Sequence, residues 1–283
     1  MKTCLIVEGG GFKTGFTTGI LDSFLACDYD PFDGYIGVSG GTIALSYYLA
    51  KQYRACISAI QFLAEDPDFT RFRRTLGEGG YMNIDLIANA AGNHALFDLE
   101  AALSKLKDGH VHFVATCREE GTPEYLVPDR ETWIDCCVAS CTIPFITKGR
   151  HEFNGRAFFD GGWSDALPVR WAYEQGAREI LVLRTNTLDL RSTQSWSDFF
   201  GSKYFDPSTA LGAVFAHSHD RYNESLDFMN NPPADLNIIQ IAPEETLKSG
   251  AYSYSAKSLM QDYRNGLDLG LSHLHGQHAK GKF

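Results

Sequence analysis

Residues 37–41, with the sequence GVSGG, hold the side chain with the clearest potential for chemistry. They match the pattern G-x-S-x-G, after a strand-like run and before an apolar, helix-like run at 42–50. A sharp turn from strand to helix would expose the Ser39 hydroxyl, and Gly37 and Gly41 would avoid clashes with the neighbouring strand and helix. The helix amides would then face negative charge that develops beside the hydroxyl. The spacing predicts a nucleophile elbow, and a purely structural turn is the alternative.

A glycine-rich loop follows the first predicted strand. Residues 3–7 form a short apolar run of buried-strand type, residues 9–13 have the sequence GGGFK, and a helical pattern begins at Thr17. Successive glycines let neighbouring backbone N–H groups turn toward one point, which suits an anion. The spacing matches neither G-x-G-x-x-G nor G-x-x-x-x-G-K-[ST], so nucleotide binding is the weaker hypothesis. Beside a serine nucleophile, the loop is better interpreted as an oxyanion hole formed by the amides of Gly10 and Gly11.

A third motif places a carboxylate at the end of an apolar strand. Residues 156–163 have the sequence RAFFDGGW, so Asp160 ends the strand and Gly161 and Gly162 follow it. Open α/β sheets collect their chemistry at the carboxyl ends of their strands, and this position would bring Asp160 to that edge. An Asp-Gly pair also begins many turns, and a purely local turn is the alternative.

Taken together, the three motifs resemble those of the patatin-like phospholipases. In that family G-G-G-x-[RK] supplies the oxyanion hole, G-x-S-x-G carries the nucleophile and D-G-[GA] carries the base. This chain has all three in the same order, at 9–13, 37–41 and 160–162. Residues 139–145 (ASCTIPF) are similar to the A-S-x-x-x-P segment of the family. The similarity covers about residues 1–185 well, and the remainder resembles the bacterial branch with weaker motifs.

The resemblance implies a serine lipid acyl hydrolase of phospholipase A or lysophospholipase type. It implies a dyad of Ser39 as nucleophile and Asp160 as base, supported by Gly161 and Gly162. Lys13 would add positive charge at the oxyanion loop or hold that loop, and an ordinary surface lysine is the alternative. A carboxylate with a pKa of about 4 is a weak base, so we expect Asp160 close to Ser39 in a partly dry cleft. No metal or other cofactor is expected.

One position departs from the family pattern. The family places glycine directly after the Arg or Lys of the oxyanion loop, whereas this chain has Thr14 there and glycine at Gly15. A positive φ at Thr14 would strain or reshape the loop. The departure keeps open a catalytically silent protein that binds lipid or a partner. A soluble carboxylesterase or thioesterase is the further alternative within enzymes.

A Ser-His-Asp triad is the alternative to the dyad. Such a triad would need a histidine on a loop at a strand end. Three histidines lie in predicted loops and qualify: His94, His110 and His151. The dyad is favoured mainly because the family resemblance implies it.

Predicted strands and helices alternate along the chain. The predicted strands are Thr3–Glu8, Tyr35–Val38, Val111–Cys117, Glu124–Val127, Arg156–Asp160, Ile180–Arg184 and Leu236–Ala242. The predicted helices are Thr17–Cys27, Thr42–Leu63, Leu99–Lys107, Thr132–Ser140, Val169–Gln175, Leu211–Met229 and Ala256–Leu274. This order indicates an α/β protein with a patatin-like, three-layer α/β/α architecture and a mostly parallel central sheet.

A single domain over 1–283 is expected. The motifs lie in a core at about 1–185, and a helical C-terminal part follows at about 207–275. Residues 65–91 are irregular, with Gly77, Gly79 and Gly80 and several aromatic residues, which predicts an inserted cap or lid.

Composition and charge limit the classes of function. The chain has 283 residues, 44% of them hydrophobic, and a formal net charge of -10. An acidic chain lacks the basic face that binds nucleic acid, so no nucleic-acid partner is expected. There is no apolar run of transmembrane length and no signal-peptide pattern, so we expect a cytoplasmic protein without a transmembrane segment. The expected partner is a lipid or another acyl ester, with transient peripheral membrane contact as an option.

The cysteine pattern is that of a reduced protein. Seven cysteines are present, an odd number, and no C-x-x-C pair occurs. Buried, reduced thiols are the simplest interpretation. Cys137 and Cys141 would share a helix face, but no fitting histidine pair lies nearby, so no metal site is expected there.

Overall fold

The structure, a computed structural model, describes residues 1–66, 69, 81–84, 86, 91–92, 96–106, 110–144, 146–147, 150–193 and 209–279. Most of the predicted cap at 65–91, and His94, lie outside the described residues. Within them, eight strands form one sheet in the order β5-β6-β3-β2-β1-β7-β8, and β4 also pairs with β3. The strands are β1 (Thr3–Val7), β2 (Gly34–Val38), β3 (His110–Cys117), β4 (Pro123–Leu126), β5 (His151–Phe153), β6 (Arg156–Asp160), β7 (Glu179–Leu183) and β8 (Asn237–Ile241).

The sheet is parallel through its centre and antiparallel at one side. The pairs β1–β2, β1–β7, β2–β3 and β7–β8 are parallel. The pairs β3–β4, β3–β6 and β5–β6 are antiparallel. The prediction of a mostly parallel central sheet is therefore confirmed, with an antiparallel extension around β3.

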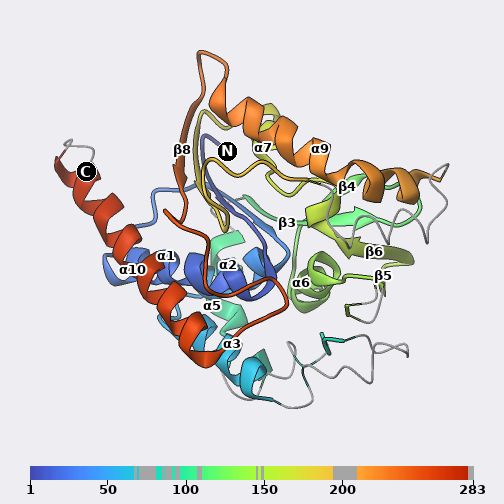
Figure 1. Ribbon diagram of the computed structural model, residues 1–283, viewed down its shortest axis with the longest axis horizontal. Helices are drawn as coiled ribbons and strands as arrows, with labels where there is room; N and C mark the ends of the chain where they lie inside the picture. Colours follow the sequence, from blue (N-terminus) through green and yellow to red (C-terminus); the bar gives the residue numbers. More distant parts are fainter. Residues whose placement is uncertain are drawn as a thin grey trace.

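Helices cover both faces of the sheet (Figure 1). They are α1 (Thr14–Ala26), α2 (Gly40–Leu49), α3 (Ala55–Glu65), α5 (Leu99–Leu106), α6 (Trp133–Cys141), α7 (Val169–Glu174), α9 (Ala210–Asn230) and α10 (Ala256–Ala279), with short 3-10 turns η1 (Gly11–Lys13) and η3 (Gly161–Trp163). Along β1, Leu5 and Val7 join the core beneath α1, α2 and α10, whereas Cys4 and Ile6 join the core beneath α7 and α9. This alternation is the two-residue period of a strand buried on both faces, and it confirms the three-layer α/β/α architecture.

The seven predicted strands are confirmed to within one residue at each end, but β5 was missed. It pairs with β6 through a two-residue turn in which Asn154 and Gly155 have φ values of 52° and 73°. Asn-Gly is the strongest short sequence signal for such a hairpin, so the sequence did contain the clue.

The prediction of one helix over 42–63 was wrong. The segment forms two helices, α2 and α3, and Lys51 and Arg54 between them have φ values of 54° and 63°. The break is held by tertiary contacts: the Gln52 side chain donates to the Leu96 carbonyl and accepts from the Asp98 amide. These partners lie more than forty residues away along the chain, so no local pattern indicates them.

The C-terminal helices lie on opposite faces of the sheet. Leu226 and Met229 of α9 pack in the core with α7, and α10 runs along α1 (Figure 1). The α1–α10 contact is so close that a Cβ atom at Gly266 would lie 1.9 Å from the Phe16 carbonyl oxygen. Among the described residues, no helix is long and apolar enough to cross a membrane.

Candidate active site

Ser39 lies at a strained turn between β2 and α2. Its backbone has φ 52° and ψ -133°, a conformation that costs a non-glycine residue free energy and persists only where surrounding contacts impose it. The Ser39 amide donates to Ser140 Oγ at 2.8 Å, and its carbonyl accepts from the Thr42 amide at 2.9 Å. The turn has the geometry expected of a nucleophile elbow.

The two glycines of the elbow are required by close packing. A Cβ atom at Gly41 would lie 2.3 Å from the Val7 carbonyl oxygen, and one at Gly37 would lie 2.8 Å from Thr42 Cα. Both distances are too short for any side chain, so the turn closes only with glycine at these positions.

Asp160 reaches Ser39 because two strands meet end to end. Strands β2 and β4 both pair with residues 113–114 of β3, and β4 and β6 both pair with 115–116. Because β4 occupies one side of β3 at these residues, β2 and β6 must both pair with the other side of β3. There β2 ends opposite residue 114 and β6 ends at Asp160, opposite residue 115. The Ser39 hydroxyl donates to Asp160 Oδ2 at 2.5 Å.

The sequence argument placed Asp160 at the carboxyl end of its strand but did not give the direction of that strand in the sheet. Strand β6 runs antiparallel to β3 and approaches the carboxyl edge of the parallel strands from outside the parallel part. The carboxylate meets the elbow because β3, eight residues long against five for β2, extends beyond β2 and supports β6 there.

The backbone and carboxylate of Asp160 are held on several sides. Its Oδ1 accepts from the Gly162 amide at 2.7 Å, and its carbonyl accepts from the Thr116 hydroxyl at 2.7 Å. Gly161 packs so tightly that a Cβ atom there would lie 2.3 Å from the Val114 carbonyl oxygen. The two predicted supporting glycines therefore differ: Gly162 binds the carboxylate, and Gly161 allows the close packing.

Burial changes the basicity of Asp160. The side chain is 5% exposed, and burial raises the pKa of its carboxyl from 3.8 to about 6, although the hydrogen bonds from Ser39 and Gly162 oppose the rise. Desolvation disfavours the charged form of an acid, which makes the ionised carboxylate a stronger base. Asp160 is thus ionised at neutral pH and far more basic than an exposed aspartate.

The glycine-rich loop lies directly against Ser39. A Cβ atom at Gly9 would lie 2.5 Å from Ser39 Cβ, and Gly11 has a φ of 56°, which favours glycine. The amide of Phe12 donates to the Ala251 carbonyl. In the described part of the chain, no hydrogen-bond acceptor within the protein is assigned to the amides of Gly10 and Gly11.

Thr14 fits the loop without strain. Its φ is -57° and its ψ is -21°, an ordinary helical conformation, so the absence of glycine at this position does not reshape the loop. The side chain is 1% exposed and faces Gly40, where a Cβ atom would lie 2.3 Å from Thr14 Oγ1. The family departure is thus accommodated by a second glycine that faces it.

Lys13 is part of the support of the loop. Its Nζ donates to Asn186 Oδ1 at 2.8 Å. Burial lowers the pKa of Lys13, and the negative charge of Glu8 opposes this effect. Lys13 is not among the described residues that line the two cavities beside Ser39.

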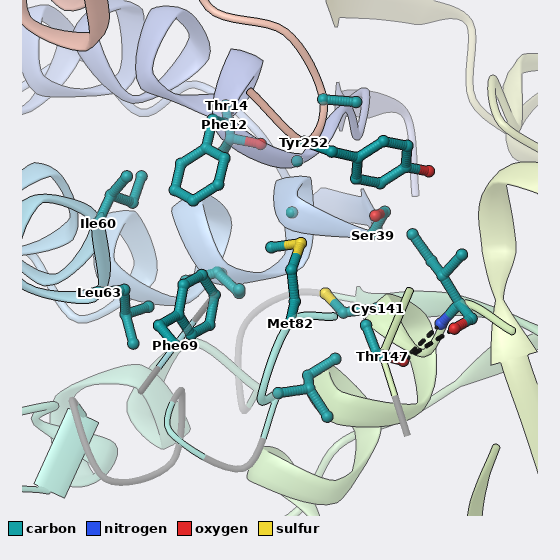
Figure 2. Close-up of a pocket in the computed structure, with 16 residues that line it drawn as sticks. Phe12, Thr14, Ser39, Ile60, Leu63, Phe69, Met82, Cys141, Thr147 and Tyr252 are labelled. Carbon is teal, nitrogen blue, oxygen red and sulfur yellow. Dashed lines mark hydrogen bonds between the residues drawn. The ribbon is translucent and has the colours of Figure 1, made fainter. Parts of the chain in front are cut away.

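Two cavities meet at Ser39. The first has a volume of about 80 Å³ and an apolar lining that includes Phe12, Ile60 and Leu63. The second has a volume of about 230 Å³ and polar groups from Glu8 and Asp160. The two share five lining residues: Gly11, Ser39, Ile143, Ala251 and Tyr252. Figure 2 shows the Ser39 hydroxyl beside Tyr252 at one end of the apolar cavity, with Ile60, Leu63 and Phe69 at the other.

The described histidines lie elsewhere. His110 is the first residue of β3 and pairs with Gly34, the first residue of β2, whereas Ser39 directly follows the last residue of β2. His110 therefore lies at the opposite end of these strands from Ser39. His151 lies on β5 with its Nε2 3.1 Å from Asp135 Oδ1, and His217 lies 3.0 Å from Asp220. In the residues that the structure describes, the assigned partner of the Ser39 hydroxyl is Asp160 and no histidine takes that place.

Potential metal ligands gather in one place outside this site. Within the described residues, ligand atoms of Cys117, Glu120 and Glu124 lie within 4.8 Å of one another. Arg156 already bonds this group, with Nη2 3.1 Å from the Cys117 sulfur and 2.9 Å from Glu124 Oε1. The guanidinium supplies the positive charge that a metal ion would bring. The seven cysteines are free thiols, six of them buried.

Several residues at the site were not predicted. Ser140 binds the elbow amide, Tyr252 lines both cavities, and Tyr222 of α9 lines the polar one. Ser140 lies in the segment that resembles A-S-x-x-x-P, which could have indicated it. No sequence motif indicated that Tyr222 and Tyr252 lie at the site, because both belong to the C-terminal part, where motifs are weak.

Sequence and structure comparisons relate the chain to known proteins. The sequence model of the patatin-like phospholipase family matches residues 5–173, and that of a domain of unknown function (DUF6363) matches 209–278. The uncharacterized protein YjjU of Escherichia coli (strain K12) is 28% identical over 270 residues, which cover 94% of this chain and 75% of YjjU. The crystal structure of VipD from Legionella pneumophila is similar with a TM-score of 0.46 and 12% identity, over 97% of this chain and 67% of that chain. Because the patatin-like phospholipase model matches more than half of this chain, the chain belongs to the patatin-like phospholipase family.

Proposed function

We propose that the protein is a serine lipid acyl hydrolase of phospholipase A or lysophospholipase type with a Ser39–Asp160 dyad. The observation that carries the proposal is the 2.5 Å hydrogen bond from Ser39 Oγ to Asp160 Oδ2, at the junction of an apolar and a polar cavity. A nucleophile within hydrogen-bond distance of a base is the arrangement that covalent catalysis requires.

The first half of the reaction acylates Ser39. As Ser39 Oγ forms a bond to the ester carbonyl carbon, its proton passes to Asp160 Oδ2 and the carbonyl oxygen takes the electron pair. The amides of Gly10 and Gly11 stabilise this oxyanion, and loss of one such donor typically costs about 10²–10³ in rate. Collapse of the intermediate breaks the bond to the alcohol, which leaves with the proton from Asp160.

The second half releases the acid. Asp160 takes a proton from a water molecule that attacks the acyl carbonyl, and the same amides stabilise the second oxyanion. Collapse breaks the bond between Ser39 Oγ and the acyl carbon, and Asp160 returns the proton to Ser39. The raised pKa of Asp160, about 6, supports both proton transfers because the carboxylate is a stronger base than usual.

The two cavities support an assignment of the two halves of the ester. The apolar cavity, with Ile60, Leu63 and Phe69 in its lining, suits the acyl chain, because burial of each CH₂ group is favourable by about 0.8 kcal/mol. The polar cavity, lined by Glu8, Asp160 and other groups, suits the leaving alcohol and the water that replaces it.

The test compares wild type with Ser39→Ala. A fluorophosphonate probe should label wild type alone, and the variant should lose ester hydrolysis while it remains folded. Ser218→Ala on α9 is the matched control, since Ser218 is 8% exposed against 9% for Ser39. Near-normal turnover by Ser39→Ala would contradict the nucleophile assignment. An absence of labelling in wild type would instead favour the catalytically silent protein.

A soluble carboxylesterase or thioesterase is the second candidate. The apolar cavity, at about 80 Å³, is small, which favours a short acyl group. Turnover of nitrophenyl butyrate without turnover of phospholipid vesicles would support this candidate. Release of fatty acid from vesicles or micelles would support the lipid hydrolase, and it would also establish contact with a lipid surface.

A further inference from the structure

The hydroxyl of Tyr222, on α9, lies at the centre of a polar network. It donates to Glu8 Oε1 at 2.7 Å. It accepts from Arg184 Nη2 at 3.1 Å and from Asn186 Nδ2 at 3.2 Å. One donated and two accepted bonds satisfy the full capacity of a phenolic hydroxyl. Glu8 and Arg184 are 3% and 1% exposed, so Tyr222 connects a buried carboxylate to a buried guanidinium.

This network holds the oxyanion loop at both ends. Glu8 directly precedes the loop, and its Oε2 accepts from the Thr185 amide at 2.6 Å. The Thr185 hydroxyl donates to the carbonyl of Gly9, the first loop residue, at 2.7 Å. At the other end, Lys13 Nζ donates to Asn186 Oδ1 at 2.8 Å. The position of the loop between Gly9 and Lys13 therefore depends on the network around Glu8.

A second contact reaches the loop from the C-terminal segment. The Phe12 amide donates to the Ala251 carbonyl at 3.2 Å, and a Cβ atom at Gly11 would lie 2.0 Å from the same oxygen. Both Tyr222 and Ala251 belong to residues 209–278, the part that matches the domain of unknown function. The segment thus binds Glu8, the residue directly before the oxyanion loop, from α9, and contacts the loop itself from Ala251, which precedes α10.

We propose that the C-terminal segment completes the active site, with Tyr222 as a positioning residue that sets the oxyanion loop beside Ser39 through Glu8 and Thr185. The inference rests on the proposed function. Tyr222 lines the polar cavity, but its hydroxyl proton is already donated to Glu8, so it acts through the loop rather than on the substrate. Loss of one member of such a network is costly, because its buried partners lose hydrogen bonds.

The experiment compares Tyr222→Phe with Tyr263→Phe in the full chain. Tyr263, on α10, also donates its hydroxyl to a buried carboxylate, Asp22 Oδ2, at 2.8 Å. Both substitutions remove a hydroxyl that donates to a buried carboxylate. The Tyr222 hydroxyl also accepts from Arg184 and Asn186, and of the two tyrosines only Tyr222 is joined to the oxyanion loop. The readouts are kcat and KM on nitrophenyl butyrate, the inhibition constant of an alkylboronic acid that forms a tetrahedral adduct with Ser39, and Tm.

The expected result is a selective loss of transition-state stabilisation. Tyr222→Phe should lower kcat by about 10- to 100-fold with little change in KM, since small displacements of a catalytic group cost rates of this order. The boronic acid should bind more weakly by a similar factor. Tyr263→Phe should also lower Tm but keep its kcat. Equal kcat values in the two variants would show a structural role for Tyr222 and overturn the inference.

A second variant tests the same inference independently of Tyr222→Phe. Thr185→Val deletes the hydroxyl that binds the Gly9 carbonyl, and it should reproduce the fall in kcat. Because both residues act through one loop, the double variant should lose less than the product of the two single effects. Normal kcat in Thr185→Val, or full additivity, would contradict the route through the loop. Wild type that neither reacts with the fluorophosphonate nor turns over ester would refute the proposed function itself.

Discussion

Replacement of Asp160 by Asn should abolish the proposed ester hydrolysis and stabilise the fold at the same time. Asparagine has nearly the same shape as aspartate, and its side-chain oxygen can accept one of the two hydrogen bonds that now come from Ser39 and Gly162. It cannot take the Ser39 proton, so acylation should stop. It also carries no charge, so its burial lacks the desolvation cost that Asp160 has in a site where the side chain is 5% exposed.

The stabilisation follows from the pKa of Asp160. Burial raises this pKa from 3.8 in the unfolded chain to about 6 in the folded protein. The folded protein thus holds the proton more tightly, so the associated stability is fully present below pH 4 and is lost as pH rises through 6. A difference of about two pKa units corresponds to about 3 kcal/mol. The unfolded carboxyl is already partly ionised at pH 4, so the gain in unfolding free energy of Asp160→Asn over wild type should grow by about 2 kcal/mol between pH 4 and pH 8.

The assay is urea unfolding of both proteins at pH 4 and pH 8, with ester turnover at pH 8. Asp165→Asn is a matched control, because burial raises the pKa of Asp165 to about 6 as well, and Tyr125 rather than Ser39 binds it at 2.6 Å. The control should gain stability with the same pH dependence and keep its turnover. A gain by Asp160→Asn that is equal at both pH values, or retained turnover, would refute the reasoning.

Three further predictions follow from the site. Turnover of a soluble ester by wild type should fall about tenfold per unit below pH 6 and level off above pH 7, because Asp160 must be ionised; a flat profile to pH 5 would contradict its role as base. Gly41→Ala should lower Tm strongly, since its Cβ would lie 2.3 Å from the Val7 carbonyl oxygen, whereas Gly92→Ala, with no atom of the described residues within 4 Å of its Cβ, should leave Tm unchanged in thermal melts followed by circular dichroism. Ile60→Trp should reduce kcat/KM for nitrophenyl octanoate more than for nitrophenyl acetate, because Ile60 lines the apolar cavity; equal losses on both esters would place the acyl chain elsewhere.

Much of the fold and the two central residues of the site could be predicted from local sequence patterns. Buried strands such as Thr3–Val7 are short apolar runs bounded by polar or glycine residues, so their ends are marked in the sequence. Ser39 and Asp160 each lie next to glycines at a strand end, and that pattern is complete within a few residues. The motifs were sufficient to identify the family because their order along the chain adds specificity that no single motif has.

The remaining features depend on contacts between distant parts of the chain. Asp160 meets Ser39 across 121 residues because β3 extends beyond β2 and antiparallel β6 pairs with it there, and no local pattern indicates that β6 pairs with β3. Thr14 is tolerated because Gly40 leaves room for it. Tyr222 binds Glu8 across 214 residues, from a helix whose local pattern shows only its amphipathic faces. A residue's own neighbours along the chain determine whether it is helical, extended or turning. Which buried polar groups satisfy one another is decided only when the layers pack, because that pairing depends on where the sheet and helices bring them together.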